Sequence, residues 1–138
     1  RVYTDDECDT LLEARLRVAE RAVDRYIHVP MTANRRAAMI DWTFNLGEGN
    51  LAASTMVKKL NSGDIAGACQ EIMRWMMVSA PRGGTNDLRD GRADGKMDCS
   101  MPENKCAGSP ARRKWQRDMC LKPDAPARPW WKFWENRT

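Results

Sequence analysis

Five cysteines are the residues of this 138-residue chain with the clearest potential for chemistry. Cys99 and Cys106 enclose a proline-containing turn, so we expect a local disulfide between them in an oxidising compartment, with two free loop thiols as the alternative. Cys8, Cys69 and Cys120 fall on the apolar faces of helical patterns, which favours small buried residues. A bridge from Cys69 to Cys120 or to Cys8 is the other interpretation. Because five is an odd number, at least one thiol lacks a partner within the chain.

Metal binding is the next chemistry to consider, and the sequence gives it little support. No CxxC motif occurs and His28 is the only histidine, which excludes the common zinc patterns. We interpret His28, which stands just before a proline, as a structural or exposed side chain. A loop rich in aspartate raises the question of calcium, but its spacing does not fit an EF-hand. Its aspartates are Asp87, Asp90, Asp94 and Asp98. The sequence therefore predicts no metal site and no cofactor.

Acid–base catalysis needs a positioned carboxyl group, and no residue stands out for that role. Glu7 is the fourth residue of a Thr4-x-x-Glu7 capping box, where a carboxylate satisfies a free backbone donor of the helix start. Glu13 and Glu20 lie on the polar face of the same helix and are expected in solvent. We therefore assign no catalytic residue from the sequence.

A helical pattern dominates the segments that must position these residues. The segment 37–46 is apolar on nearly every side of a helical wheel, so other elements must bury it. Thr32 is its expected N-cap, and Gly47 is expected to end it with a positive φ. Amphipathic helices should surround it, and no strand pattern has comparable strength. Their expected ranges are 4–30, 54–60, 64–78 and 109–121.

These patterns predict an all-α fold of about five helices around a buried central helix, with one long irregular loop. We divide the chain into a helical lobe at 1–121, which contains the loop at 79–108, and a tail rich in Pro and Trp at 122–138. Trp130, Trp131 and Trp134 in this tail are expected to fold back, to meet a partner or to contact a membrane surface. The net charge of +4 is too small to indicate nucleic acid as a partner. The start at Arg1, without Met, suggests a processed or truncated chain.

Several motifs together resemble the phage-type lysozymes, the endolysins of lambdoid and T4-like phages (glycoside hydrolase family 24). The resemblance runs from Tyr3 to Leu121. Trp75 also matches a family tryptophan. The motifs are Thr4-x-x-Glu7-Cys8-x-x-Leu11-Leu12, Pro30-Met31-Thr32-x-Asn34-x-x-Ala37-Ala38, Phe44-Asn45-Leu46-Gly47, Ser54-Thr55-x-x-x-Lys59-Leu60-Asn61-x-Gly63-Asp64-x-x-Gly67-Ala68-Cys69, and Gly108-x-x-x-Arg112-Arg113-x-x-x-x-x-x-Cys120-Leu121.

The resemblance implies the C-terminal helical lobe of a lysozyme-like α+β fold. The family's catalytic Glu, with its assisting Asp and Thr, lies in an N-terminal lobe that has no counterpart among these residues. Two motif positions also differ, because Ser109 replaces a Leu and Gln116 replaces a Glu. By resemblance, Phe44, Asn45 and Gly47 line the sugar groove, although Phe44 as a core residue and Asn45 as a helix end are the simpler alternatives.

By the same resemblance, Arg112 and Arg113 face the missing acid and bias its ionisation. Pairing with surface carboxylates is the alternative for both.

The resemblance implies an endolysin-type lysozyme (muramidase) that hydrolyses β-1,4 glycosidic bonds of bacterial peptidoglycan during host lysis, here without its acid-bearing lobe. It implies a phage-encoded protein that acts in the host periplasm or cell wall. The alternative is a non-catalytic module, derived from a lysozyme, that binds peptidoglycan or a protein.

Overall fold

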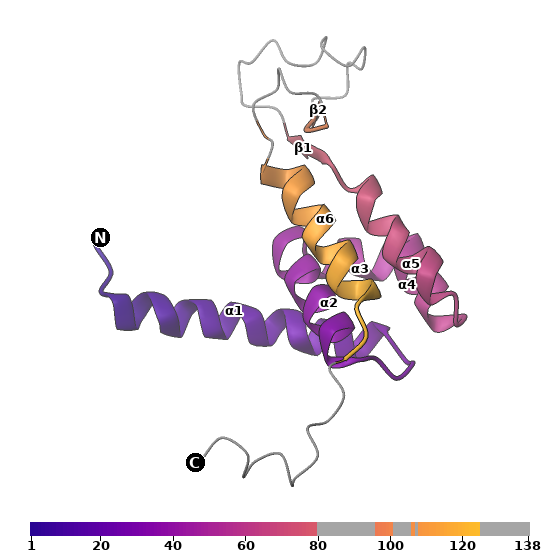
Figure 1. The fold of residues 1–138 in the computed structure, drawn as a ribbon. Helices are drawn as coiled ribbons and strands as arrows, with labels where there is room; N and C mark the ends of the chain where they lie inside the picture. Colours follow the sequence, from indigo (N-terminus) through magenta and orange to yellow (C-terminus); the bar gives the residue numbers. More distant parts are fainter. Residues whose placement is uncertain (80–95, 101–105, 107, 125–138) are drawn as a thin grey trace, which may run out of the picture.

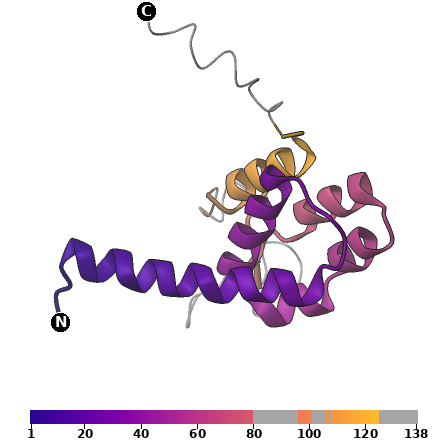
Figure 2. The same ribbon diagram turned by 90° about the horizontal axis from the view of Figure 1, so that it is seen from below.

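The computed structural model describes residues 1–79, 96–100, 106 and 108–124. Six α-helices form most of this part, in an arrangement that confirms the predicted helical lobe (Figure 1). α2, α4, α5 and α6 pack together, and α1 projects from this body (Figure 2). The tail at 125–138, including its tryptophans, lies outside the described residues, as does most of the loop at 79–108.

α1 (Asp5–Tyr26) begins with the predicted capping box. The backbone N–H of Glu7 donates to the Thr4 hydroxyl at 3.3 Å, and the Thr4 N–H donates back to the Glu7 carboxylate at 2.9 Å. The helix ends at Tyr26, before the predicted limit at Pro30, because Ile27 has already turned to an extended conformation. Both ends are therefore set by local backbone chemistry.

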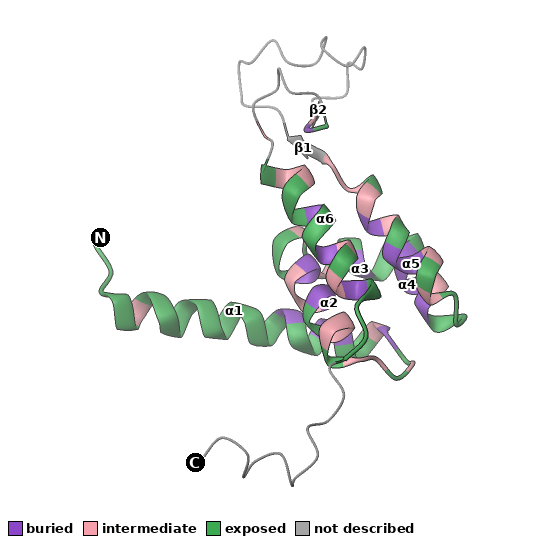
Figure 3. Ribbon diagram, in the orientation of Figure 1, coloured by how far each residue is buried: buried purple, intermediate pink, exposed green. Residues whose placement is uncertain are grey.

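The spacing of apolar residues predicts one continuous packed stripe along this helix, but the buried residues of α1 all lie in its second half. Ala19, Ala22 and Val23 enter the core against α2 and α3. Leu11 and Leu12 are about half exposed, at 51% and 47%, and Figure 3 shows nearly all of the first half as exposed. The apolar stripe is present along the whole helix, but the other described elements cover only its later turns.

α2 (Ala33–Leu46) is the central helix, and its N-terminus is capped twice. Thr32 accepts a hydrogen bond from the Arg35 N–H, as predicted, while Asp124 accepts from the free backbone N–H groups of Ala33 and Asn34. These bonds tie the end of the described chain to the start of α2, where a carboxylate also favours the helix dipole.

α2 is buried along one side rather than all round, which corrects the sequence prediction. Ala38, Met39 and Trp42 are completely buried, and Trp42 meets Trp75 edge to face with ring centroids 5.0 Å apart. Ile40 is only partly buried, and Phe44 is 37% exposed. Apolar residues on the outer side of a helix therefore mark a surface that the described residues leave open.

Three short helices complete the layer beside α2: α3 (Glu48–Ala53), α4 (Thr55–Asn61) and α5 (Ile65–Glu71). Ser54 caps α4 and Asp64 caps α5 through side-chain bonds to backbone N–H groups. Gly63, with φ of +88°, makes the turn between them, because glycine tolerates a positive φ.

The helix expected to continue to Val78 stops early, which is a further correction. A 3₁₀ turn, η1 (Ile72–Arg74), follows α5, and then β1 (Met77–Ser79) pairs antiparallel with β2 (Lys96–Asp98). No strand was expected from the pattern, because three-residue strands carry too few residues to show an alternation.

α6 (Gly108–Leu121) packs along α2 and turns Arg113, Gln116 and Cys120 inward. The sequence pattern predicts Trp115, Met119 and Cys120 on the apolar side of this helix, but Trp115 is 48% exposed. The polar side chains of Arg113 and Gln116 are buried instead.

Two disulfides join the described cysteines. Cys69 and Cys120 link α5 to α6 with their Cα atoms 5.6 Å apart, so the bridged alternative is correct for this pair. Cys99 and Cys106 form the local bridge expected from their spacing. Cys8 is a free, exposed thiol rather than a buried one. None of the described helices is long and apolar enough to cross a bilayer.

The Cys69–Cys120 bridge should be the more stabilising of the two. Its sequence separation of 51 means that it removes more freedom from the unfolded chain than the other bridge, whose separation is 7. The double change Cys69→Ala with Cys120→Ala should lower the free energy of unfolding by about 4 kcal/mol, against about 2 kcal/mol for Cys99→Ala with Cys106→Ala. Urea denaturation without reductant measures both, and equal losses would contradict this ranking.

Acid should weaken the contact between α4 and α5. Hydrogen bonds from Lys59 (2.8 Å) and Arg74 (3.1 Å) hold the pKa of Glu71 below its usual value. A lowered folded-state pKa stabilises the fold above the unfolded value of about 4.3, and this contribution disappears as the pH falls through the folded value.

Glu71→Gln should therefore flatten the loss of Tm between neutral and acidic pH. The matched control is Glu13→Gln, which removes an exposed i,i+4 pair with Arg17 instead. Identical acid profiles for the Glu71 variant and the unchanged chain would show that this carboxylate contributes nothing.

Candidate functional site

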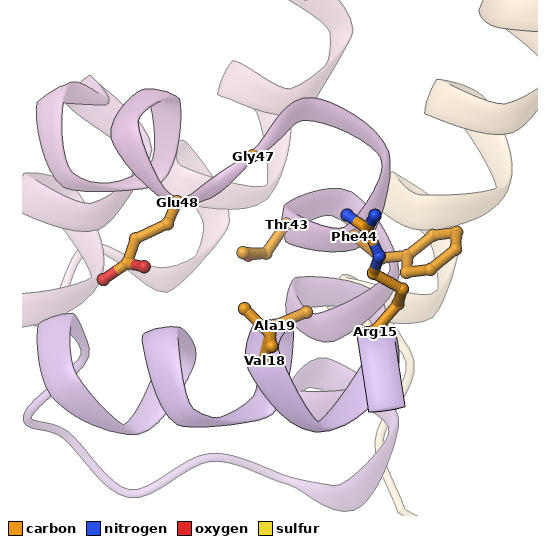
Figure 4. A pocket seen from close by; sticks show the side chains of 7 residues that line it. All are labelled: Arg15, Val18, Ala19, Thr43, Phe44, Gly47 and Glu48. Carbon is orange, nitrogen blue, oxygen red and sulfur yellow. The ribbon is translucent and has the colours of Figure 1, made fainter. Parts of the chain in front are cut away.

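A surface hollow of about 570 Å³ lies where α1, α2 and α3 meet (Figure 4). Two residues predicted to line a sugar groove, Phe44 and Gly47, are part of its wall. The complete lining is Arg15, Val18, Ala19, Thr43, Phe44, Gly47 and Glu48. The hollow is therefore built from one turn of α1, the end of α2 and the start of α3.

Gly47 shapes this end of α2. Its φ of +94° lies in the region that favours glycine, and its N–H donates to the Thr43 carbonyl at 2.7 Å. Its carbonyl accepts from the Leu51 N–H at 3.2 Å, which begins the hydrogen bonding of α3. A Cβ at Gly47 would meet no atom within 4 Å, so the glycine is needed for its backbone conformation rather than for space.

Opposite charges lie at the two ends of the hollow. Figure 4 shows Arg15 beside the Phe44 ring at one end and the Glu48 carboxylate at the other. Glu48 is paired with Arg25, so its charge is already partly neutralised. The apolar middle, with Val18 and Ala19, suits a ligand that has an apolar face and polar edges.

Asn45 lies next to Phe44 but belongs to a different group of side chains. Its Oδ1 accepts a hydrogen bond from Nη2 of Arg113, a residue only 1% exposed. Arg113 also donates from Nε to the Trp75 carbonyl at 3.0 Å and from Nη1 to Oε1 of Gln116. Its guanidinium thus binds three different elements of the body.

The Asp41 carboxylate is connected to Arg113 through the side chain of Gln116. Gln116 donates from Nε2 to Oδ2 of Asp41 at 2.5 Å. Arg112 donates to both Asp41 oxygens, at 2.7 and 3.2 Å. Burial and the nearby charge of Arg112 lower the pKa of Arg113, while Asp41 opposes that shift.

The predicted binding residues therefore separate into two neighbouring groups. Phe44 and Gly47 line the hollow, and Asn45, Arg112 and Arg113 belong to what we call the Arg113 network, which also contains Asp41 and Gln116. In the described part of the chain, Arg113 is too deeply buried to contact a ligand directly. Arg112 pairs with the carboxylate of Asp41, which agrees with the alternative of a surface ion pair.

Sequence reasoning missed five lining residues of the hollow, and each had only a weak signal. Arg15, Val18 and Ala19 share one face of a helix by their spacing, but nothing local indicates that this face meets α2. Glu48 directly follows Gly47, yet a carboxylate in a turn is common. Thr43 appeared only as part of the apolar helix.

The described residues hold no group of three or more side chains suited to a metal ion. Asp98 instead accepts hydrogen bonds from the N–H and hydroxyl of Ser100, at 2.9 and 2.7 Å. The other three aspartates of the acidic loop lie outside the described residues. His28 is exposed, and its ring Nε2 contacts the Arg25 carbonyl at 2.8 Å, which is a structural role.

Comparison of the sequence with known proteins supports the resemblance. Among its relatives is the SAR-endolysin of Bacteriophage PS119, 39% identical over 75 residues that make up 54% of this chain and 45% of that protein. The probable prophage lysozyme of Escherichia coli (strain K12) is 31% identical over 109 residues, 78% of this chain and 52% of that protein. The chain thus spans about half the length of these relatives.

Solved structures show the same fold. The endolysin from Escherichia coli O157:H7 phage FAHEc1 superimposes with a TM-score of 0.68 at 24% identity, over 90% of this chain and 66% of that one. The muramidase domain of SpmX from Asticaccaulis excentricus gives a TM-score of 0.67 at 22% identity, over 87% and 69%. At these identities, the likeness is one of fold.

The family assignment rests on the sequence itself. Residues 1–92, about two thirds of the chain, match the profile of the family described as Phage lysozyme. This range includes α1, α2 and every residue that lines the hollow. The chain belongs to the phage lysozyme family.

Proposed function

We propose that this chain is the helical lobe of a longer endolysin-type muramidase and that its hollow forms one wall of a peptidoglycan-binding cleft. Family membership and relatives that carry the names endolysin and lysozyme support this proposal. Since the chain spans only about half of those relatives, the activity belongs to a longer protein in which another segment completes the cleft.

The observation that carries the proposal is the open apolar face of α1 beside the hollow. Leu11, Leu12 and Leu16 are between 37% and 51% exposed, and Val18, which is 47% exposed, also lines the hollow. Several exposed apolar side chains along one helix call for a covering partner. A second lobe packed on these turns would stand next to the hollow and enclose it.

Glycoside hydrolysis needs a proton-donating carboxyl group and a second acidic group or an activated water. We place the proton donor on the covering lobe, in line with the resemblance. The described lobe contributes the Phe44 ring, which can pack on the apolar face of a sugar, and the Gly47 backbone, which allows close approach. Arg112 keeps 42% of its side chain exposed beside Asp41, where its charge would favour the ionised form of an approaching carboxyl group, which suits the second acidic group rather than the proton donor.

The remaining expectations also stand as parts of this proposal. The protein would be phage-encoded and would act on the host cell wall, where two disulfides are stable. Trp130, Trp131 and Trp134 would contact a membrane surface or a partner protein. These residues lie outside the described part of the chain.

Adding the upstream coding sequence should convert the chain into an active muramidase. The 138-residue chain alone should release no soluble muropeptides from purified peptidoglycan, because its proton donor is missing. The extended protein should release them, as measured by chromatography and by loss of turbidity. The control is the extended protein with its added glutamates changed singly to Gln. An extended protein that sediments with peptidoglycan but releases nothing would identify a binding module instead.

Phe44→Ala in the extended protein should lower kcat/KM about fivefold, which corresponds to an aromatic contact of about 1 kcal/mol. Its Tm should change little, because the ring is already more than a third exposed.

Trp115→Ala is the matched control, since it removes an aromatic of similar exposure that lies on α6 and outside the hollow. Equal effects of the two changes on kcat/KM would show that the hollow does not bind the substrate.

A further inference from the structure

We propose that Arg113 locks the Asn45 side chain as a hydrogen-bond donor towards the ligand surface, so that this position selects an oxygen acceptor on the glycan. This inference rests on the proposed function and assigns a recognition rule to its site. Arg113 is then a positioning residue that acts through Asn45.

The first step is the direction of the Asn45 amide. A guanidinium carries only donors, so the atom of Asn45 that meets Nη2 of Arg113 must be the carbonyl oxygen Oδ1. The amide nitrogen Nδ2, with its two hydrogens, must then point away from Arg113. Within the described part of the chain, no acceptor takes a hydrogen bond from this nitrogen, and Asn45 is exposed.

The second step is the charge behind that amide. The side chain of Arg113 is almost fully buried, and its three acceptors among the described residues are neutral oxygens of Trp75, Gln116 and Asn45. The carboxylate of Asp41 is reached only through Gln116. A cation without a direct counter-ion makes strong charge-assisted bonds, and it polarises the amide that accepts from it. The N–H groups of Asn45 therefore become better donors.

The third step is the location of this donor. Asn45 directly follows Phe44, whose ring forms part of the hollow, and directly precedes the turn at Gly47. A sugar packed on the Phe44 ring would bring its substituents to the Asn45 side of α2. A fixed donor there favours a carbonyl or hydroxyl oxygen and disfavours an ammonium group or an N–H.

Asn45→Asp tests this directly, because it keeps an oxygen for Arg113 and removes both donors. The probe is the neutral tetramer of N-acetylglucosamine, titrated into the 138-residue chain and followed by NMR. The variant should bind at least tenfold more weakly, while its Tm should stay equal or rise because a carboxylate now pairs with the buried cation. Asn50→Asp is the matched control for the added charge, since Asn50 lies on α3 outside the network, and it should bind within twofold of the unchanged chain.

Arg113→Lys tests the positioning role separately from stability, because the NMR signal of the Asn45 side-chain amide reports how that amide is held. The ammonium group carries its donors on one nitrogen and lacks the planar fork that reaches the separate acceptors of Trp75, Gln116 and Asn45, so the Asn45 side-chain amide resonance should shift towards that of a free asparagine. Its shift on addition of the tetramer should also be lost. An unchanged Asn45 resonance in this variant would overturn the positioning role.

The inference fails if Asn45→Asp binds the tetramer as well as the unchanged chain does, or if this substitution lowers the Tm. Failure of the proposed function looks different: the extended protein then releases no muropeptides, and the unchanged chain does not bind the tetramer. An extended protein that cleaves peptidoglycan equally well with and without Asn45→Asp would overturn the inference alone.

Discussion

The buried guanidinium of Arg113 is the constraint on which the α2–α6 side of the structure depends. Removing such a charge from water costs several kcal/mol, so its donors need acceptors with good geometry. Those acceptors come from the chain after η1, from α6 and from α2, through Trp75, Gln116 and Asn45. The three elements must therefore keep one relative position. The Cys69–Cys120 bridge holds α6 to α5 in the same body, so covalent and polar restraints act together.

Gln116 explains how a cation and an anion share this interior without touching. Its amide accepts from Arg113 and donates to Asp41, so both of its ends have a fixed direction. The glutamate that the family resemblance would place here would pair directly with Arg113, but it would repel Asp41 at the same short distance. Glutamine is thus the residue type that satisfies both neighbours. The departure from the family motif is consistent with the carboxylate of Asp41, which also holds Arg112.

Local chemistry was predictable from the sequence, and long-range pairing was not. The caps at Thr4 and Thr32 followed from residue types within one turn, and the structure has both. Trp115 was placed inward because an apolar pattern says nothing about polar residues that satisfy one another across two helices. The β1–β2 pair joins residues 77–79 to residues 96–98, so no pattern within a few neighbouring residues predicts it. For the candidate site, the sequence located Phe44 and Gly47 through the family motif, but it could not show that one turn of α1 completes the hollow.

The division of α1 into a buried and an exposed half has a thermodynamic consequence. Helical segments shorter than about 12–15 residues are marginal in water without tertiary support. Residues 5–16 have the capping box at Thr4 but no described neighbour that buries their leucines, whereas the later turns are fixed by Val23 and the core. The first turns should therefore exchange rapidly between helix and coil, with backbone amides that open far more often than those near Val23. The continuous helix of Figure 1 thus joins two segments of very different local stability.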